Sequence, residues 1–262
     1  MSDTDFSGQA VLITGGASGI GYAAAQAFAK RGARIAIADL NQDTAQAQAA
    51  TLGDGHIGLG GDVSTEATAD RLVSATMDAF GRIDVLINCA GMSDTFLDTI
   101  DQTAEHWQRL IDVHLTGTFV MSKRAAREMI AAGYGVVINI SSIAGILALP
   151  RRNAYTAAKH GIVGLTRNLA CEWAQKGIRV NAIAPGYIRT PLVQNLIDQG
   201  KIDEKKIRRR TPLGEMLPPS AIADAMIFLA SPLARTVTGV NLPVDGGYTV
   251  YGGMVDAAEI ED

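Results

Sequence analysis

The chain has 262 residues, of which 47% are hydrophobic and 28 are glycine, and its formal net charge is -4. This is enough apolar material for the core of one α/β domain, and we expect residues 1–262 to form a single domain. Charges of both signs are interspersed, so no basic stripe or acidic tail predicts a nucleic acid or an anionic membrane as partner. A small-molecule ligand is favoured.

The cysteines, the histidines and the N-terminal segment indicate the compartment and whether a metal is bound. Cys89 and Cys171 lie far apart in apolar stretches, which is typical of two buried, reduced thiols. The histidines show no HExxH spacing and no cysteine partner, so no metal site is predicted; they are His56, His106, His114 and His160. The N-terminus lacks the basic flank of a signal peptide, and no apolar run reaches about 18 residues. We therefore expect a cytoplasmic protein.

Short apolar runs typical of strands alternate with helical segments along the chain. The strand-like runs are 10–16, 34–40, 84–91, 135–142, 178–186 and 238–247. The helical segments are 19–31, 65–80, 104–132, 155–176 and 220–230. Near-continuous apolar strands with helical crossovers predict a doubly wound α/β fold, in which helices cover both faces of a parallel sheet.

The first expected strand runs into the glycine-rich stretch TGGASGIG at 14–21. Such a turn lets the backbone approach a pyrophosphate, and the following helix offers free N–H groups to it. The spacing differs from GxGxxG, so this signal is weak alone. The second strand ends at Asp39, whose carboxylate would bind an adenosine ribose and repel a 2′-phosphate. Together they favour NAD over NADP, although Asp39 also suits a strand-end turn.

A charged segment flanked by proline, 188–216, has two interpretations. It is either a solvated pair of helices or a mobile substrate lid. Its cations add local positive charge, for which a solvated face is the default interpretation; they are Lys205, Arg208, Arg209 and Arg210.

The stretch AYTAAKHG at 154–161 places a tyrosine and a lysine four positions apart. In a helix Tyr155 and Lys159 would lie one turn apart on the same face. They could act on one ligand, or form a surface pair that stabilises the helix by a few tenths of a kcal/mol.

Eight motifs in this order resemble the short-chain dehydrogenase/reductase family over about residues 8–253. They are TGGASGIG (14–21), Asp62-Val63, NCAG (88–91), NISS (139–142), YTAAK (155–159), RVNAIAPG (179–186), Thr190-Pro191 and DGG (245–247). The resemblance implies a single Rossmann-type domain with a substrate lid around 188–216. It also implies hydride transfer between C4 of a nicotinamide and a secondary carbon.

By this resemblance Tyr155 is the general acid/base, and Lys159 binds the nicotinamide ribose and lowers the pKa of Tyr155. A phenol with a pKa near 10 is a poor base at neutral pH, and a neighbouring ammonium favours its phenolate. Ser142 lies thirteen residues before Tyr155, the family's spacing for the serine that orients the substrate oxygen. The alternative is Ser141, and a strand-end serine can also simply cap.

The resemblance implies that Asp62-Val63 flank the adenine and that NCAG lines the cofactor floor, with Cys89 where the family usually has asparagine. The residues expected to bind NAD are Gly15, Ser18, Gly19, Ile20, Gly21, Asp39, Leu40, Asp62, Val63, Asn88, Ala90, Gly91, Tyr155, Lys159, Pro185, Gly186, Ile188 and Thr190.

One departure from the family concerns catalysis. In DVHLTGTF (112–119), His114 stands where the family usually has an asparagine that holds a water linked to the lysine. Histidine donates and accepts hydrogen bonds and ordinarily titrates near neutrality. We therefore expect a functional replacement with a changed pH profile, the alternative being a core histidine that only packs.

The C-terminal run and the lid sequence look most like those of sugar and polyol dehydrogenases in the family, which implies a polyhydroxylated substrate. Arg151 and Arg152 precede Tyr155 and could clamp a carboxylate, phosphate or sulfonate, or lie at a surface or subunit interface. The expected substrate contacts are Ser142, Arg151, Arg152 and Tyr155.

Two other functions stay open. A 3-oxoacyl thioester reductase would use the lid cations to meet phosphopantetheine, but Asp39 argues against the NADPH that biosynthetic reductions usually draw on. A non-catalytic nucleotide-binding protein would not need the intact serine, tyrosine and lysine spacing. The family resemblance implies a homotetramer or homodimer formed by helices around 104–132 and 155–176.

Overall fold

The computed structural model describes residues 3–260. Within this range one parallel sheet has the strand order β3-β2-β1-β4-β5-β6-β7. Its strands are β1 (Ala10–Thr14), β2 (Arg34–Asp39), β3 (Ile57–Gly60), β4 (Val85–Asn88), β5 (Gly135–Ile140), β6 (Ile178–Pro185) and β7 (Asn241–Val244). The predicted fold class, a Rossmann-type doubly wound sheet, is confirmed.

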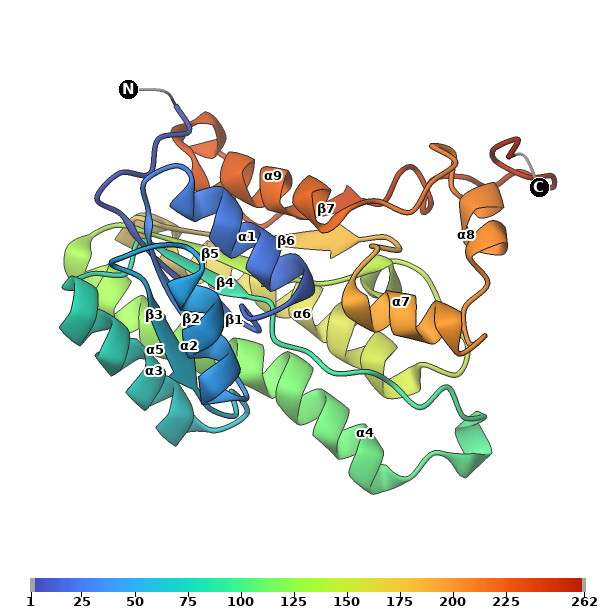
Figure 1. The fold of residues 1–262 in the computed structure, drawn as a ribbon, viewed down its shortest axis with the longest axis horizontal. Coiled ribbons are helices and arrows are strands. Elements are labelled where there is room, and N and C mark those ends of the chain that lie inside the picture. The colour runs from blue at the N-terminus through green and yellow to red at the C-terminus, as the bar shows by residue number, and fades with distance from the viewer. Residues whose placement is uncertain (1–2, 261–262) are drawn as a thin grey trace.

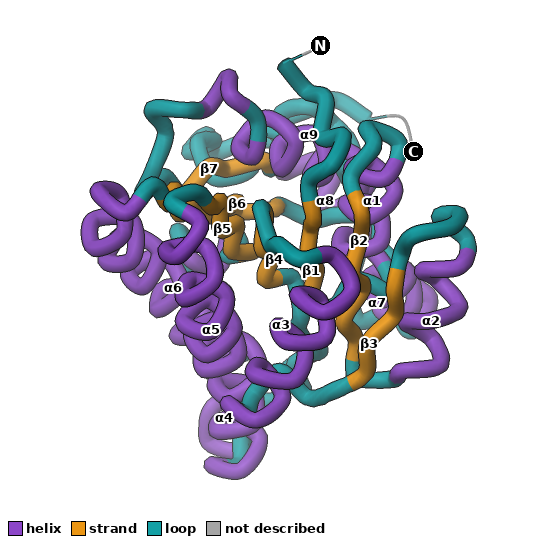
Figure 2. Tube along the Cα trace, turned by 90° about the vertical axis from the view of Figure 1, so that its left-hand side faces the viewer, coloured by secondary structure: helices purple, strands orange, loops and turns teal. Residues whose placement is uncertain are grey.

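Helices cover both faces of the sheet (Figures 1 and 2). They are α1 (Gly19–Ala29), α2 (Gln42–Ala50), α3 (Glu66–Phe80), α4 (Ala104–Ile111), α5 (Gly117–Ala132), α6 (Asn153–Trp173), α7 (Pro191–Asp198), α8 (Glu204–Arg210) and α9 (Pro219–Ala230). Figure 2 shows α4, α5 and α6 on one side of the strands and α1, α2 and α9 on the other.

The central strands are largely apolar, and both of their faces are buried. In β1 the side chains of Val11 and Ile13 join the core under α1 and α9, whereas Ala10 and Leu12 join the core under α3, α5 and α6. This alternation follows the two-residue period of a strand. The sheet is thereby fixed between two apolar layers, so the loops at its carboxyl edge are held by a rigid support.

Strand order reverses at β1, which pairs with β2 on one side and with β4 on the other. Thr14 is in register with Ala38 of β2 and with Asn88 of β4. The chain therefore leaves these strands in opposite directions along the sheet and opens a crevice at their carboxyl ends.

Three elements differ from the sequence expectations. β3 and α2 were not predicted: the four residues of β3 include two glycines, and the residues of α2 are mostly polar or alanine and lack an apolar stripe. The helix expected over 104–132 is divided by a π-helical turn, Asp112–Thr116, between α4 and α5. The segment 188–216 forms two helices, α7 and α8, at one end of the molecule (Figure 1).

Both cysteines are free. The expectation of two buried thiols is wrong for Cys171, which lies on the outer face of α6 and is exposed, while its neighbour Ala170 faces the core. None of the helices within residues 3–260 combines the length and the hydropathy that a membrane span requires. In the same range no three potential metal ligands gather into a cluster.

Candidate active site

A cleft of about 510 Å³ opens at the carboxyl ends of the central strands. Its lining comes from the glycine-rich turn, the ends of β4, β5 and β6, the π-helical turn, α6 and α7. It contains most of the residues predicted from sequence: Gly15, Ser18, Gly19, Ile20, Gly21, Asp39, Leu40, Asp62, Val63, Ala90, Gly91, His114, Ser142, Arg152, Tyr155, Lys159, Pro185, Gly186, Ile188 and Thr190.

The glycine-rich turn between β1 and α1 brings bare backbone to the cleft wall. Gly15 and Gly19 have φ angles of +62° and +53°, which residues with a Cβ rarely adopt. A Cβ on Gly15 would lie 2.7 Å from the Cα of Ala90, and one on Gly21 would lie 2.2 Å from the carbonyl oxygen of Gly15. Backbone atoms of the turn therefore pack directly against neighbouring backbone. The N-terminus of α1, behind the turn, suits a pyrophosphate.

Asp39 lies at the end of β2, beside this turn. Its Oδ2 accepts the backbone N–H of Ala17 at 3.1 Å and its Oδ1 accepts that of Leu40 at 2.8 Å. Each carboxylate oxygen keeps a further lone pair, so the group is oriented and still able to accept hydrogen bonds from a ribose diol. Asp62, further along the lining, pairs with Arg109 at 2.8 Å.

Tyr155 and Lys159 lie one turn apart on α6, and both line the cleft. Lys159 is 4% exposed, so the surface-pair interpretation is wrong. Its ammonium donates to the carbonyl oxygen of Ile140 at 2.7 Å and lies 5.4 Å from the Tyr155 ring centroid. Burial lowers the pKa of Lys159, and the neighbouring Tyr155 hydroxyl opposes that shift.

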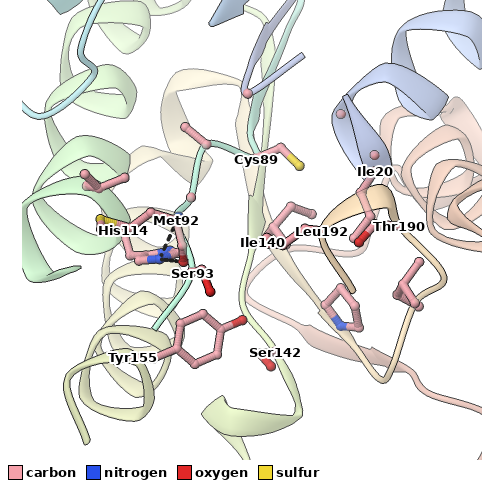
Figure 3. Close-up of a pocket in the computed structure, with 18 of the residues that line it drawn as sticks. Ile20, Cys89, Met92, Ser93, His114, Ile140, Ser142, Tyr155, Thr190 and Leu192 are labelled. Carbon is pink, nitrogen blue, oxygen red and sulfur yellow. Dashed lines mark hydrogen bonds between the residues drawn. The ribbon is translucent and has the colours of Figure 1, made fainter. Parts of the chain in front are cut away.

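The two serines after β5 have different environments. Ser141 donates to the carbonyl oxygen of Ile183 at 2.9 Å and lies 2.6 Å from Oδ1 of Asn241, so it is bound within the sheet. Ser142 Oγ accepts the backbone N–H of Ala144 at 3.1 Å, which leaves its own proton for a ligand. In Figure 3 the hydroxyls of Ser142 and Tyr155 both point into the cleft. This geometry supports the choice of Ser142.

His114 lies in the π-helical turn and packs edge-on against Tyr155, with ring centroids 5.2 Å apart (Figure 3). Its Nε2 is 3.2 Å from both the backbone nitrogen and the carbonyl oxygen of Met92, while its Nδ1 is buried without a hydrogen-bond partner among the described residues. Burial, with the charge of Lys159, lowers the pKa of His114 to about 3. The expectation that His114 titrates near neutrality is therefore wrong, because a charged imidazole would be desolvated here.

The structure separates the two arginines expected to bind substrate. Arg152 lines the cleft, and its Cζ lies 4.0 Å from the ring centroid of Tyr155. Arg151 lies outside the cleft, where it forms an exposed ion pair with Asp98 at 2.7 Å. Because adjacent side chains leave the backbone in different directions, the two guanidiniums do not form a clamp.

Other predicted residues also lie apart from the cleft. Asn88 is buried in the sheet, where it donates to Ser122 Oγ and Asn139 Oδ1, both at 2.9 Å. It therefore joins strands instead of lining the cofactor floor. Among the lid cations, Arg208 donates to the carbonyl oxygen of Gly214, and Arg210 lies over the rings of Tyr248 and Tyr251.

Several residues that line the cleft belong to no motif and were not predicted. Tyr187, which follows β6, is one of them. The others include the apolar residues Met92, Val113, Leu149, Leu192 and Leu196. Burial raises the pKa of Tyr187 to about 12. A possible signal was the apolar face of PLVQNL at 191–196, which the structure places over the cleft as α7.

The comparisons with known proteins agree with this geometry. Residues 15–249 match the family model described as enoyl-(acyl carrier protein) reductase. The chain belongs to the short-chain dehydrogenase/reductase family, whose members are oxidoreductases that act on CH–OH groups with a nicotinamide cofactor.

Curated relatives resemble the chain over most of its length. It is 39% identical to D-threitol dehydrogenase of Mycolicibacterium smegmatis, covering 95% of this chain and 96% of the relative. It is 40% identical to cis-4-hydroxycyclohexanecarboxylate dehydrogenase of Sinomonas cyclohexanicum, covering 93% and 98%. An uncharacterized short-chain type dehydrogenase/reductase of Sinorhizobium fredii is 41% identical over 92% of this chain, which spans only 44% of that longer protein.

Among solved structures, a 3-ketoacyl-(acyl-carrier-protein) reductase from Brucella melitensis complexed with NADH superposes with a TM-score of 0.88 and 33% identity. The alignment covers 94% of this chain and all of that one.

Proposed function

We propose that the protein is an NAD-dependent dehydrogenase that oxidises a secondary alcohol of a hydroxylated small molecule, such as a polyol or a cyclic alcohol, or reduces the corresponding ketone. The observation that carries the proposal is the placement of Tyr155 and Lys159 on one face of α6, inside the cleft and opposite Ser142. The named activities of the threitol and hydroxycyclohexanecarboxylate relatives support this substrate class.

Each side chain has a role in moving the proton. A bound nicotinamide cofactor supplies the hydride acceptor or donor. Ser142 donates its free O–H to the substrate oxygen and orients it, and Tyr155 takes the carbinol proton during oxidation or returns it during reduction. Lys159 is held near Tyr155 by the carbonyl oxygen of Ile140. Its ammonium stabilises the phenolate more strongly here than in water, because the site is desolvated.

His114 supports these residues as a neutral group. With a pKa of about 3 its imidazole is uncharged near neutral pH, so it does not act by titrating. Its Nδ1 has no hydrogen-bond partner among the described residues but is buried, so the surrounding side chains would have to move before it could hold a water, the role that the family gives to asparagine.

We propose NAD as the preferred cofactor on the strength of Asp39. Its carboxylate is fixed by two backbone N–H groups at the cleft, and a 2′-phosphate placed there would meet a negative charge. The residues that would hold the cofactor are those of the glycine-rich turn, Asp39, the Asp62-Val63 pair and Lys159.

A second candidate, reduction of a 3-oxoacyl thioester, is supported by the likeness to the Brucella melitensis reductase. It is the weaker candidate, because Arg208 is bound to the carbonyl oxygen of Gly214 within its own segment and Arg210 lies over the rings of Tyr248 and Tyr251. We also propose a reducing, cytoplasmic compartment, which the two free cysteines support.

The test is NADH formation on a panel of polyols, cyclic alcohols and hydroxy acids, with NAD and NADP in parallel. NAD-dependent turnover of a secondary alcohol is the expected result. Activity confined to 3-oxoacyl thioesters with NADPH would favour the second candidate, and NADH binding without any turnover would favour a binding role.

A further inference from the structure

Arg152 lies in the substrate half of the cleft with its guanidinium fixed in orientation. Its Cζ lies 4.0 Å from the ring centroid of Tyr155 and 4.9 Å from that of Phe96. Stacking of this kind holds a planar guanidinium by its faces and leaves the N–H groups at its edge. The edge is the part that forms hydrogen bonds to an oxyanion.

The protein does not use these N–H groups. Within residues 3–260 the guanidinium of Arg152 makes no hydrogen bond, and its nearest acid is Asp94, whose Oδ2 lies 3.9 Å from Nε. The Asp94 side chain is 2% exposed and is held through Oδ1 by the backbone N–H of Thr95 at 2.7 Å and by His106 Nε2 at 3.2 Å. Asp94 thus attracts the Nε side of Arg152 from behind, and the Nη side stays free.

The charges around the cleft favour an anion at this end. The acids that line it are Asp39 and Asp62, both in the cofactor half. Of the cations among the described residues that line the cleft, Arg109 pairs with Asp62 and Lys159 donates to the carbonyl oxygen of Ile140, so Arg152 is the one left to face the substrate. A polyol hydroxyl could accept a hydrogen bond from the Nη groups of Arg152 but would bring no opposite charge, whereas a carboxylate would accept two parallel, charge-assisted hydrogen bonds from them.

We infer that Arg152 binds an anionic group of the substrate, so that the preferred substrates are hydroxy acids, in which the oxidised secondary alcohol and a carboxylate or similar oxyanion belong to one molecule. The inference rests on the proposed dehydrogenase function and narrows its substrate class. Arg152 determines specificity, while Asp94 positions it.

Two matched pairs of compounds test the inference: 4-hydroxycyclohexanecarboxylate with its primary amide, and 3-hydroxybutyrate with its primary amide. Wild type, Arg152→Gln and Arg152→Lys are compared, with Arg151→Gln as the control because that neighbour pairs with Asp98 outside the cleft. Of the two acids, the one that wild type turns over more efficiently is expected to have a kcat/KM at least about tenfold higher than its own amide. Arg152→Gln is expected to abolish that preference mainly through KM, Arg152→Lys to keep part of it, and Arg151→Gln to keep all of it.

A binding measurement separates this inference from the proposed function. Calorimetric titration of cyclohexanecarboxylate into the NADH complex is expected to show a Kd at least about tenfold weaker for Arg152→Gln than for wild type, with unchanged NADH affinity. Equal carboxylate affinity in wild type and Arg152→Gln would overturn the role of Arg152. So would a kcat/KM that falls by the same factor for acid and amide in Arg152→Gln. Turnover of neutral alcohols without preference for acids would overturn the inference alone. Carboxylate binding without any turnover would overturn the proposed function alone.

Discussion

At the residue scale, the environment of His114 determines how it acts. Because its pKa is about 3 in the folded protein, it stays neutral wherever the enzyme is assayed. We expect the pH dependence of kcat for His114→Asn to keep the shape of the wild-type profile between about pH 5 and 9, the range well above that value. Steady-state rates across this range provide the check, and an inflection near pH 6.5 in wild type that the variant lacks would show that His114 does titrate.

The same pKa predicts a loss of stability in acid. The unfolded chain binds a proton at His114 as the pH falls through about 6.5. The folded protein binds this proton only as the pH falls through about 3. The free energy of unfolding contributed by this difference is therefore present above pH 6.5 and is lost progressively down to pH 3. Urea melts should show a steeper acid decline for wild type than for His114→Asn, with His160→Asn as a surface control. Parallel slopes for wild type and His114→Asn would contradict the prediction.

Asp39 is the residue on which the cofactor preference depends. Replacement by Asn removes the charge that repels a 2′-phosphate while keeping a hydrogen-bonding side chain. We expect the ratio of kcat/KM for NADP to that for NAD to rise at least about tenfold in Asp39→Asn. The exposed Asp43, in the first turn of α2, gives the control variant Asp43→Asn. An unchanged ratio in Asp39→Asn would remove the basis for preferring NAD.

At the element scale, the turn between β1 and α1 has no room for a Cβ at Gly15 or Gly21. A Cβ on Gly21 would lie 2.2 Å from the carbonyl oxygen of Gly15, so Gly21→Ala must displace the backbone that faces the cofactor. We expect NADH binding at least about tenfold weaker and a lower Tm, since even modest displacement forfeits oriented N–H contacts. Gly164→Ala in α6, where a Cβ meets no atom within 4 Å, is expected to be neutral or to stabilise by about 1 kcal/mol. Similar behaviour of the two variants in calorimetry would refute this account of the turn.

Elements with strong patterns could be predicted from the sequence, and those without could not. The central strands are apolar on both faces, and their order with the helices was sufficient to predict the doubly wound sheet. β3 and α2 lie at the sheet edge, where short, glycine-containing or polar sequences suffice because less surface is buried. The π-helical turn had no sequence signal, although it sets the position of His114 against Tyr155.

Residue motifs likewise predicted which side chains meet, but not where each one points. Tyr155, Lys159 and Ser142 do line one cleft. Arg151 and Asn88 do not, because side-chain direction depends on local backbone and packing: Arg151 has a φ of +68°, and Asn88 points into the sheet. The burial that lowers the pKa of His114 is likewise a property of the folded chain.

At the scale of the whole molecule, large apolar side chains stay exposed on the layer formed by α4 and α5. Trp107 and Phe119 are both 41% exposed, and Ile130 is 39% exposed. We propose that these helices pack between subunits of a homotetramer or homodimer. Light scattering should then give a multiple of 27.5 kDa, and Phe119→Asp should shift the protein toward smaller species, because a buried charge is costly. A monomeric wild type would refute the proposal, and Ile100→Asp, in the exposed 3₁₀ turn Thr99–Asp101, serves as control.

The central claim is that Tyr155, supported by Lys159 and Ser142, exchanges the proton while a nicotinamide cofactor bound in the same cleft exchanges the hydride. Its most direct test compares Tyr155→Phe with wild type, using NADH formation on a substrate from the panel and calorimetric binding of NADH. The account predicts a fall in kcat of about 10²- to 10⁴-fold with NADH affinity nearly unchanged, because only the acid/base hydroxyl is removed. Wild-type kcat in the Phe variant would show that the proton is transferred elsewhere and would contradict the account.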